Sequence, residues 1–183
     1  MNSSGSIFCC LSALLGAVLA TVAVGADDLV AERGAELLSP FKKDLQQALI
    51  AGMQDGPESA IRACKEKAPQ IADALSVDGV LVGRTSHKLR NPANTAPNWV
   101  TPVLEAYLSM GSARTPAVVP LADNRIGYVE PIVMQALCLN CHGDALQPEL
   151  AARIREDYPQ DAATGFSVGD LRGVFWAEFP ADY

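Results

Sequence analysis

Residues 117–142 read AVVPLADNRIGYVEPIVMQALCLNCH, and this stretch does most to determine the predicted fold. Two apolar runs, 117–121 and 126–134, flank the turn-forming sequence Ala-Asp-Asn-Arg at 122–125. Short apolar runs separated by such a turn predict a β-hairpin. The second run leads directly into the cysteine motif at the end of the stretch, so we expect the hairpin to adjoin that motif.

Helices are predicted before this hairpin, and a strand after it. Apolar residues recur at helical spacing over residues 28–51, where Pro40 is expected to kink or divide the helix. After a break at 52–56, a second helix is predicted from Pro57, with a kink at Pro69. Further elements are a strand or turn at 78–83, an irregular loop at 84–98, helices at 99–110 and 148–158, and a strand at 171–179. This order predicts one α+β domain with antiparallel strands.

The hairpin stretch ends in Cys138-Leu139-Asn140-Cys141-His142, which is the C-x-x-C-H motif of c-type haem attachment. Cysteines three residues apart share one face of a helical turn, so each thiol can add to one vinyl group of the same porphyrin. His142 lies on that face as well and can reach the iron as the proximal ligand. The motif therefore predicts one covalently attached haem c.

Other interpretations of the cysteines are open at this stage. Cys138 and Cys141 can form a disulfide or a thioredoxin-like redox pair, which makes a thiol-disulfide oxidoreductase the alternative function. Together with Cys64 and a histidine they can also bind zinc. Of the five cysteines in the chain, Cys9 and Cys10 belong to the N-terminal apolar segment. Three then remain, and an odd number does not suit a disulfide framework.

Residues 7–26 carry no charge and end in small residues, directly before Asp27 and Asp28. This pattern predicts a secretory signal peptide at 1–26, although the segment before the apolar run has no Lys or Arg. The alternative is an uncleaved anchor formed by 7–26. Either would place residues 27–183, as a single domain, outside the cytoplasmic membrane, so we expect a periplasmic or otherwise exported protein.

The overall charge excludes some classes of function. With 21 acidic against 14 basic residues, the net charge is -7, which argues against binding to nucleic acid. Apolar residues make up 49% of the chain, so it is not a disordered protein. The chain holds two histidines and no nucleophile motif, so no hydrolase triad and no enzymatic activity are expected.

Three further stretches carry a resemblance to a known family. They are residues 60–64 (Ala-Ile-Arg-Ala-Cys) with Ala-Pro at 68–69, the loop residues Arg-Thr-Ser at 84–86 with Leu-Arg-Asn-Pro at 89–92 and Asn94, and Gly-Asp-Leu-Arg-Gly at 169–173. Together with the C-x-x-C-H motif, they resemble the exported single-haem c-type domains of PAS-like fold, long described as a domain of unknown function. The resemblance implies a five-stranded antiparallel sheet, flanked by helices, with the haem packed against it.

The resemblance also implies His142 and Cys64 as the two iron ligands. From the residues alone, Cys64 belongs to an apolar stripe on a predicted helix, and most free cysteines are small buried hydrophobes. His87 is predicted to be a loop or surface histidine, with a role as sixth ligand as the alternative. Three arginines are candidates for binding the haem propionates, against the alternative of a solvated surface position: Arg84, Arg90 and Arg172.

A cysteine thiolate on the iron would favour the ferric state and lower the reduction potential. If the thiolate left on reduction, a position would open for NO or CO. The sequence therefore predicts an exported, cytochrome-like monohaem protein for low-potential electron transfer or for redox or gas sensing, with an unknown redox or signalling protein as partner.

Overall fold

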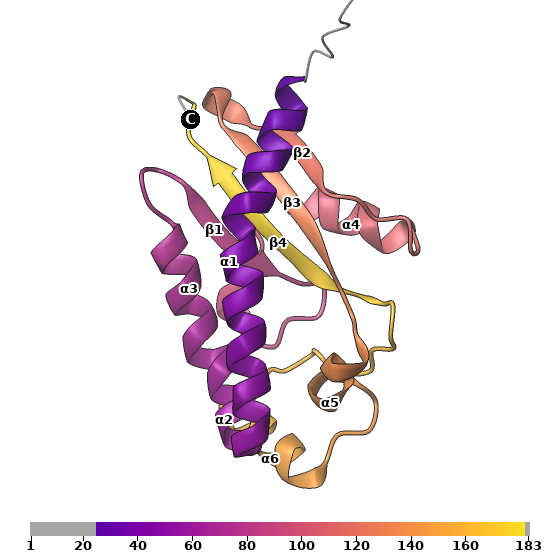
Figure 1. Cartoon of the computed structure of the whole chain (residues 1–183). Coiled ribbons are helices and arrows are strands. Elements are labelled where there is room, and N and C mark those ends of the chain that lie inside the picture. Colours follow the sequence, from indigo (N-terminus) through magenta and orange to yellow (C-terminus); the bar gives the residue numbers. More distant parts are fainter. Residues whose placement is uncertain (1–24, 182–183) are drawn as a thin grey trace, which may run out of the picture.

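The computed structural model describes residues 25–181. Its helices are α1 (Ala26–Asp55), α2 (Pro57–Arg62), the π-helical turn η1 (Ala63–Lys67), α3 (Ala68–Leu75), α4 (Thr101–Ser109), α5 (Leu139–His142) and α6 (Pro148–Asp157). Its strands are β1 (Leu81–Thr85), β2 (Ala117–Pro120), β3 (Ile126–Val133) and β4 (Leu171–Phe179). Short 3₁₀ turns are η2 (Pro92–Asn94), η3 (Ala122–Asn124) and η4 (Ala136–Cys138). Figure 1 shows the long α1 lying across the sheet.

The strands form one antiparallel sheet in the order β1-β4-β3-β2, which confirms the α+β prediction with helices at the N-terminus. The predicted hairpin is β2–β3, paired from Ala117 opposite Val129 to Pro120 opposite Ile126. The C-terminal strand β4 is central and pairs with both β1 and β3. The expectation of five strands is wrong for residues 25–181, where four are paired. The segments between these four are helical or interrupted by proline and glycine, which weaken strand pairing.

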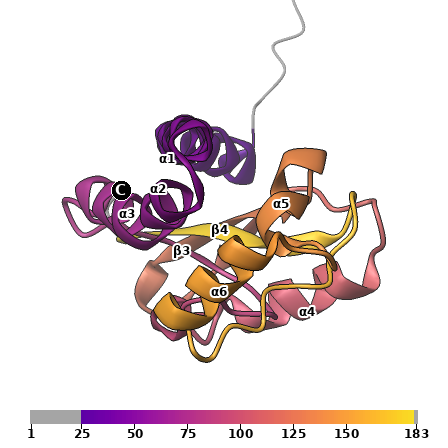
Figure 2. The ribbon, with the colours of Figure 1, turned by 90° about the horizontal axis from the view of Figure 1, so that it is seen from below.

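The sheet has a core on each face. In Figure 2, α1 and α3 lie on one side of the sheet and α4 on the other. Successive side chains of a strand point to opposite faces, so Phe175 and Phe179 of β4 pack with Phe41 of α1 while Val174 packs with Leu104 of α4. Apolar residues thus cover both faces and fix the position of α1 over the sheet.

The predicted break of the first helix is wrong, because α1 runs without interruption through Pro40 and Gly52. Pro40 and Glu36 are both exposed, so the carbonyl that loses its helical donor at Pro40 faces water. Gly52 is buried where α1 meets α2, and an ideal Cβ there would lie 2.8 Å from the carbonyl oxygen of Ser59. Glycine is used here for close helix packing. The chain turns at Gly56, whose φ is 109°.

The strand or turn predicted at 78–83 has different bounds in the structure. Asp78 and Gly79 form a turn with positive φ, and the strand β1 begins only at Leu81 and continues to Thr85. Arg84 and Thr85, predicted as loop, are therefore strand residues next to β4.

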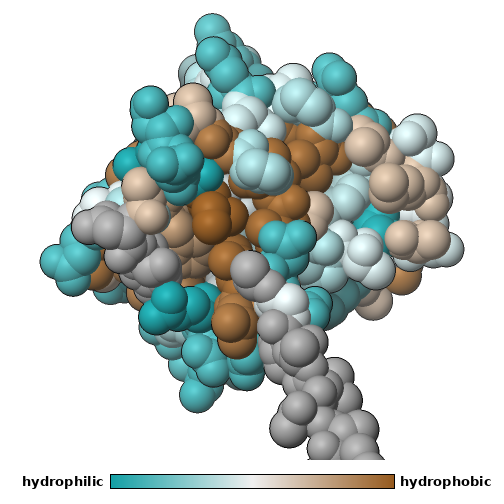
Figure 3. Space-filling model, turned by 90° about the horizontal axis from the view of Figure 1, so that it is seen from above, coloured by the Kyte–Doolittle hydropathy of each residue, from teal (hydrophilic) through white to brown (hydrophobic). Residues whose placement is uncertain are grey.

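The predicted signal peptide falls on residues that lie almost entirely outside the described part of the chain. Within residues 25–181, no helix combines the length and apolar character needed to cross a bilayer. Figure 3 looks onto the end at which α1 begins, where hydrophobic residues gather in the middle of the surface and hydrophilic ones surround them.

Candidate functional site

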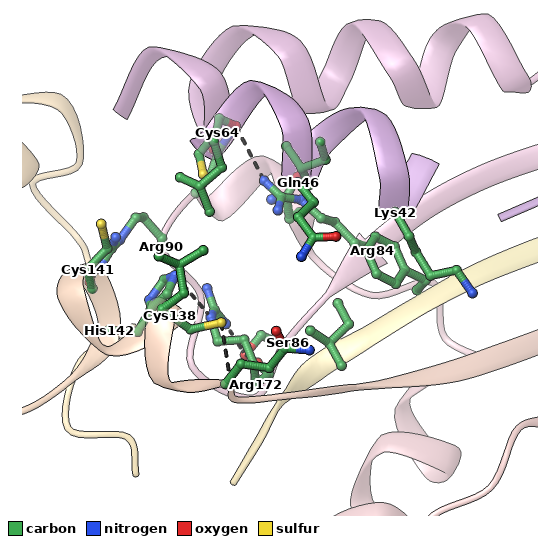
Figure 4. A pocket seen from close by; sticks show the side chains of 18 of the residues that line it. Lys42, Gln46, Cys64, Arg84, Ser86, Arg90, Cys138, Cys141, His142 and Arg172 are labelled. Atoms are coloured by element: carbon green, nitrogen blue, oxygen red, sulfur yellow. Dashed lines mark hydrogen bonds between the residues drawn. The ribbon is translucent and has the colours of Figure 1, made fainter. Parts of the chain in front are cut away.

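A cavity of about 350 Å³ lies between α1 and η1 on one side and the end of β3 with the C-x-x-C-H turn on the other. The structure brings every predicted haem-attachment residue and Cys64 to this cavity (Figure 4). Its polar and sulfur-bearing lining includes Cys64, Arg84, Thr85, Ser86, Arg90, Cys138, Cys141, His142 and Arg172. Cys64 comes from the helical side in Figure 4, and His142 from the side of the motif.

Cys64 owes its position to the π-helical turn η1, which precedes Pro69. Pro69 has no N–H and its ring would clash with the carbonyl of Lys65 in a regular helix. The wider turn relieves this clash, and the sharp kink expected at Pro69 is replaced by one π turn. In that turn the carbonyl of Cys64 has no backbone donor at position 69, and Nη2 of Arg84 donates to it instead at 3.3 Å.

The predicted apolar stripe, which includes Ile61, Cys64 and Ala68, therefore does not pack against a single neighbour. Ala68 joins the core under α1, and Ile61 packs with α6. Cys64 between them is half-buried and faces the cavity, so its placement in the core is wrong. The π turn offsets the helical face at this point, which a regular 3.6-residue period cannot show.

The C-x-x-C-H motif forms the turn η4 and the short helix α5. The amide of Cys138 donates to the carbonyl of Gln135 at 3.0 Å. Arg90 holds the other end of the motif: its Nη2 donates to the carbonyl of Cys141 at 2.7 Å and to that of Ala163 at 3.1 Å. Its Nε and Nη2 also donate to the Asp161 carboxylate, each at 3.1 Å. Arg90 thus ties the motif to the segment that precedes β4.

His142 is held in one tautomer by its two neighbours. Its Nδ1 lies 2.7 Å from the carbonyl oxygen of Ala163, and its Nε2 lies 3.5 Å from Nε of Arg172. A carbonyl only accepts and a guanidinium only donates, so the contacts assign the hydrogen to Nδ1 and a lone pair to Nε2, which accepts from Arg172 over a long contact. Burial, with Arg172 and Arg90 nearby, lowers the pKa of His142 to about 2, which keeps the ring neutral. A neutral ring with its lone pair on Nε2 is the form that binds a metal.

The three cysteines of the described chain are free and half-buried. Burial raises the pKa of the Cys141 thiol, and the neighbouring Cys64 adds to this effect. A thiol-disulfide enzyme needs a lowered thiol pKa, so this environment does not favour that alternative. Among residues 25–181, no three His, Cys, Asp or Glu side chains are grouped to hold a metal ion, so the structure has no preformed zinc site.

The three candidate arginines differ in their partners. Arg90 is paired with Asp161, whereas Arg84 and Arg172 have no carboxylate partner among the described residues. Arg172 donates to Oγ of Ser86 at 2.7 Å, and burial near the other two arginines lowers its pKa to about 10. The cavity wall therefore carries positive charge that forms no ion pair with a carboxylate of residues 25–181.

Sequence reasoning missed Phe166, which lies buried beside the site. Its ring meets His142 edge-on, with centroids 6.3 Å apart, and Nζ of Lys88 lies 4.9 Å from its centroid. His87 packs against the same ring at 5.7 Å but is itself exposed and does not line the cavity. The sequence signal for Phe166 was weak, because it is a single aromatic residue in a loop of small and polar residues.

The comparisons with known proteins agree with the motif-based resemblance. The sequence profile of the Tll0287-like family matches residues 21–180. The crystal structure of the cyanobacterial heme-protein Tll0287 is similar in fold, with a TM-score of 0.61, 24% identity, and coverage of 78% of this chain and 92% of that chain. No curated protein matches. Because the family profile spans most of the chain and the fold agrees, the chain belongs to the Tll0287-like family.

Proposed function

We propose that this chain binds one haem c, attached through Cys138 and Cys141 with His142 as an axial ligand. We further propose that it acts outside the cytoplasmic membrane, without catalysis, in low-potential electron transfer or in redox or gas sensing. One observation carries the proposal. A neutral, enclosed His142 lines a cavity together with the two free thiols of its own motif, and the lone pair on its Nε2 meets only the long 3.5 Å contact from Arg172. The solved relative described as a heme-protein adds to the case.

The environment of His142 suits a metal ligand. Metal-binding histidines usually donate their second ring N–H to a carbonyl or carboxylate, which fixes the ring and raises the basicity of the ligating nitrogen. The contact of Nδ1 with the carbonyl of Ala163 at 2.7 Å is of this kind. Phe166 packs edge-on against the ring and limits its rotation.

The thiols of Cys138 and Cys141 suit covalent attachment. In each addition the S–H adds across a vinyl double bond: a carbon–sulfur bond forms and the thiol hydrogen ends on the other vinyl carbon. No oxidant or reductant is consumed, so free thiols in the described structure are the form that the reaction needs.

The positive wall of the cavity suits the two carboxylates of a porphyrin. Arg84 and Arg172 lack a carboxylate partner among residues 25–181. Buried charges are stable when they are paired and hydrogen-bonded. Propionates at this wall would supply the missing partners.

Cys64 is the proposed second ligand. It faces the cavity from η1, and the family resemblance implies a cysteine at this position. When bound, a haem with a thiolate ligand supplies one-electron chemistry at low potential. If the thiolate leaves on reduction, NO or CO can take its place, which would make the protein a sensor.

The test is the absorption spectrum of the purified protein, ferric and then dithionite-reduced, for the wild type and Cys64→Ala. We expect a Soret band in both and a thiolate-type charge-transfer band in the ferric wild type alone. His87→Ala is the control, because His87 is exposed and outside the cavity lining. Colourless protein from a strain with working haem attachment would refute the proposal. A spectrum that responds to His87→Ala and not to Cys64→Ala would refute the ligand assignment.

A further inference from the structure

Helix α1 contributes one wall of the cavity of about 350 Å³. Its side chains in the lining are Lys42, Leu45, Gln46, Leu49 and Met53, which follow one another at helical spacing. This spacing places them on one face of α1. The wall is therefore mainly apolar, and the side chains of Lys42 and Gln46 interrupt it.

The two polar side chains of this wall differ in their partners. Nζ of Lys42 donates to Oε2 of Glu130 at 2.6 Å, so this cation is already paired. The Gln46 side chain makes no hydrogen bond to another residue of the described chain. In Figure 4 it projects from α1 into the cavity. An amide NH₂ carries two donors, so Gln46 brings hydrogen-bonding capacity to this wall that no described residue uses.

Gln46 lies on the same side of the cavity as Cys64. Helix α1 packs against η1, and Figure 4 shows both side chains entering from the helical side, opposite His142 and Cys138. The two axial positions of a haem iron lie on opposite faces of the porphyrin. On the proposed function, His142 occupies one of these positions. The amide of Gln46 then lies on the other face, where Cys64 is the proposed ligand.

The amide can turn toward that face without breaking a contact inside the protein. Gln46 is exposed although it lines the cavity, so it lies at the mouth. Its side chain is long and flexible, and no described partner holds it. The guanidinium of Arg84 is the neighbouring donor, but its Nη2 already donates to the carbonyl of Cys64 at 3.3 Å.

We propose that Gln46 determines ligand specificity: when Cys64 leaves the iron, the Gln46 NH₂ group donates a hydrogen bond to the diatomic ligand that replaces it. This inference rests on the proposed function. Hydrogen-bond donors on the open face help to decide what a haem binds. A donor stabilises a ligand more when that ligand carries more negative charge on its outer atom, and NO on ferrous haem is the better acceptor than CO. Gln46 therefore favours NO over CO.

The first experiment measures the C–O stretch of the dithionite-reduced, CO-bound protein by infrared spectroscopy. A hydrogen bond to the oxygen of CO weakens the C–O bond and lowers its stretching frequency. Gln46→Leu removes the donor and should raise the frequency. Gln47→Leu is the matched control, because Gln47 is the next residue of α1, is equally exposed, and does not line the cavity. Each variant is also made with Cys64→Ala, which opens the iron position whether or not the thiolate leaves.

Gln46→Glu separates hydrogen bonding from shape. Glutamate has nearly the same size as glutamine, but its ionised carboxylate has no hydrogen to donate. This variant should raise the C–O frequency at least as much as Gln46→Leu does. If Gln46 acted only by filling space, Gln46→Glu would keep the frequency of the wild type.

The second experiment measures how fast NO and CO leave the reduced protein. Loss of one net hydrogen bond corresponds to a factor of about two to ten. We expect NO to dissociate faster by about this factor in Gln46→Leu, and CO to change by less. Gln47→Leu should leave both rates unchanged.

The outcomes are distinguishable. A raised C–O frequency in both Gln46 variants, with Gln47→Leu unchanged, supports the proposal. A haem-loaded protein whose C–O frequency is the same in the wild type and both Gln46 variants would overturn it and leave the proposed function standing. Equal changes in NO and CO dissociation would overturn the preference for NO. Colourless protein would refute the proposed function itself.

Discussion

Replacing Arg90 by alanine should destabilise the domain more than the loss of any surface arginine. The Arg90 and Asp161 side chains are 11% and 9% exposed, so their ion pair is largely removed from water. Truncation of one partner leaves the other charge buried and unpaired, which costs about 3–5 kcal/mol. Against a total stability of about 5–15 kcal/mol, this is a large fraction.

Arg90→Lys separates charge from geometry. Lysine keeps the positive charge near Asp161 but cannot reproduce the fork that also reaches the carbonyls of Cys141 and Ala163. We expect a smaller loss, about 2 kcal/mol, from these hydrogen bonds. Asp161→Asn in the Arg90→Ala background should cost little more, because the acid is already without its partner.

Urea unfolding followed by tryptophan fluorescence measures these effects as shifts of the midpoint at constant slope. Arg153→Ala is the control, since Arg153 is 36% exposed, its partners Glu58 and Glu156 lie at the surface, and Asp157, which is 9% exposed, keeps Lys65 as a partner. Exposed pairs contribute about 0–1 kcal/mol. If Arg90→Ala cost no more than Arg153→Ala, Arg90 would not be the structural tie between the motif and the segment at Asp161.

Three further predictions concern packing, pH and the π turn. Gly34→Ala should lose about 2 kcal/mol in urea unfolding, because a Cβ would lie 2.3 Å from the Tyr128 ring; an unchanged midpoint would contradict this. The pKa of His142 falls from 6.5 when unfolded to about 2 when folded, so stability is complete above pH 6.5 and falls below it by up to about 1.4 kcal/mol per unit. His142→Gln should flatten this fall of stability with pH, and an equal slope in both proteins would refute its assignment to His142. Pro69→Ala restores an N–H, so η1 should close into a regular helix and turn Cys64 from the cavity; an unchanged ligand spectrum in the ferric protein would refute this.

Much of the fold could be predicted because the strands carry their own signals. The runs around residues 122–125 and the alternation over 171–179 gave the hairpin and the C-terminal strand, and both are present. The continuity of α1 could not be predicted, because the effect of Pro40 depends on whether its neighbourhood faces water. A sequence pattern does not contain that information until the helix is placed on the sheet.

The candidate site, too, could be predicted from the sequence only in part. Spacing alone placed Cys138, Cys141 and His142 together, and the family resemblance added Cys64. The difference between Arg90 and the other two arginines could not be predicted, because it depends on Asp161, 71 positions away. The packing of the Trp176 indole over Gly83 depends likewise on strand register, which neither residue alone indicates.

One proline fixes both Cys64 and the arginine beside it. Pro69 removes a backbone donor, and the resulting π turn leaves the Cys64 carbonyl to Arg84. A helix that closed regularly would satisfy that carbonyl itself and free the guanidinium to swing elsewhere. The defect in hydrogen bonding therefore fixes both the direction of the Cys64 side chain and the place of the positive charge beside it.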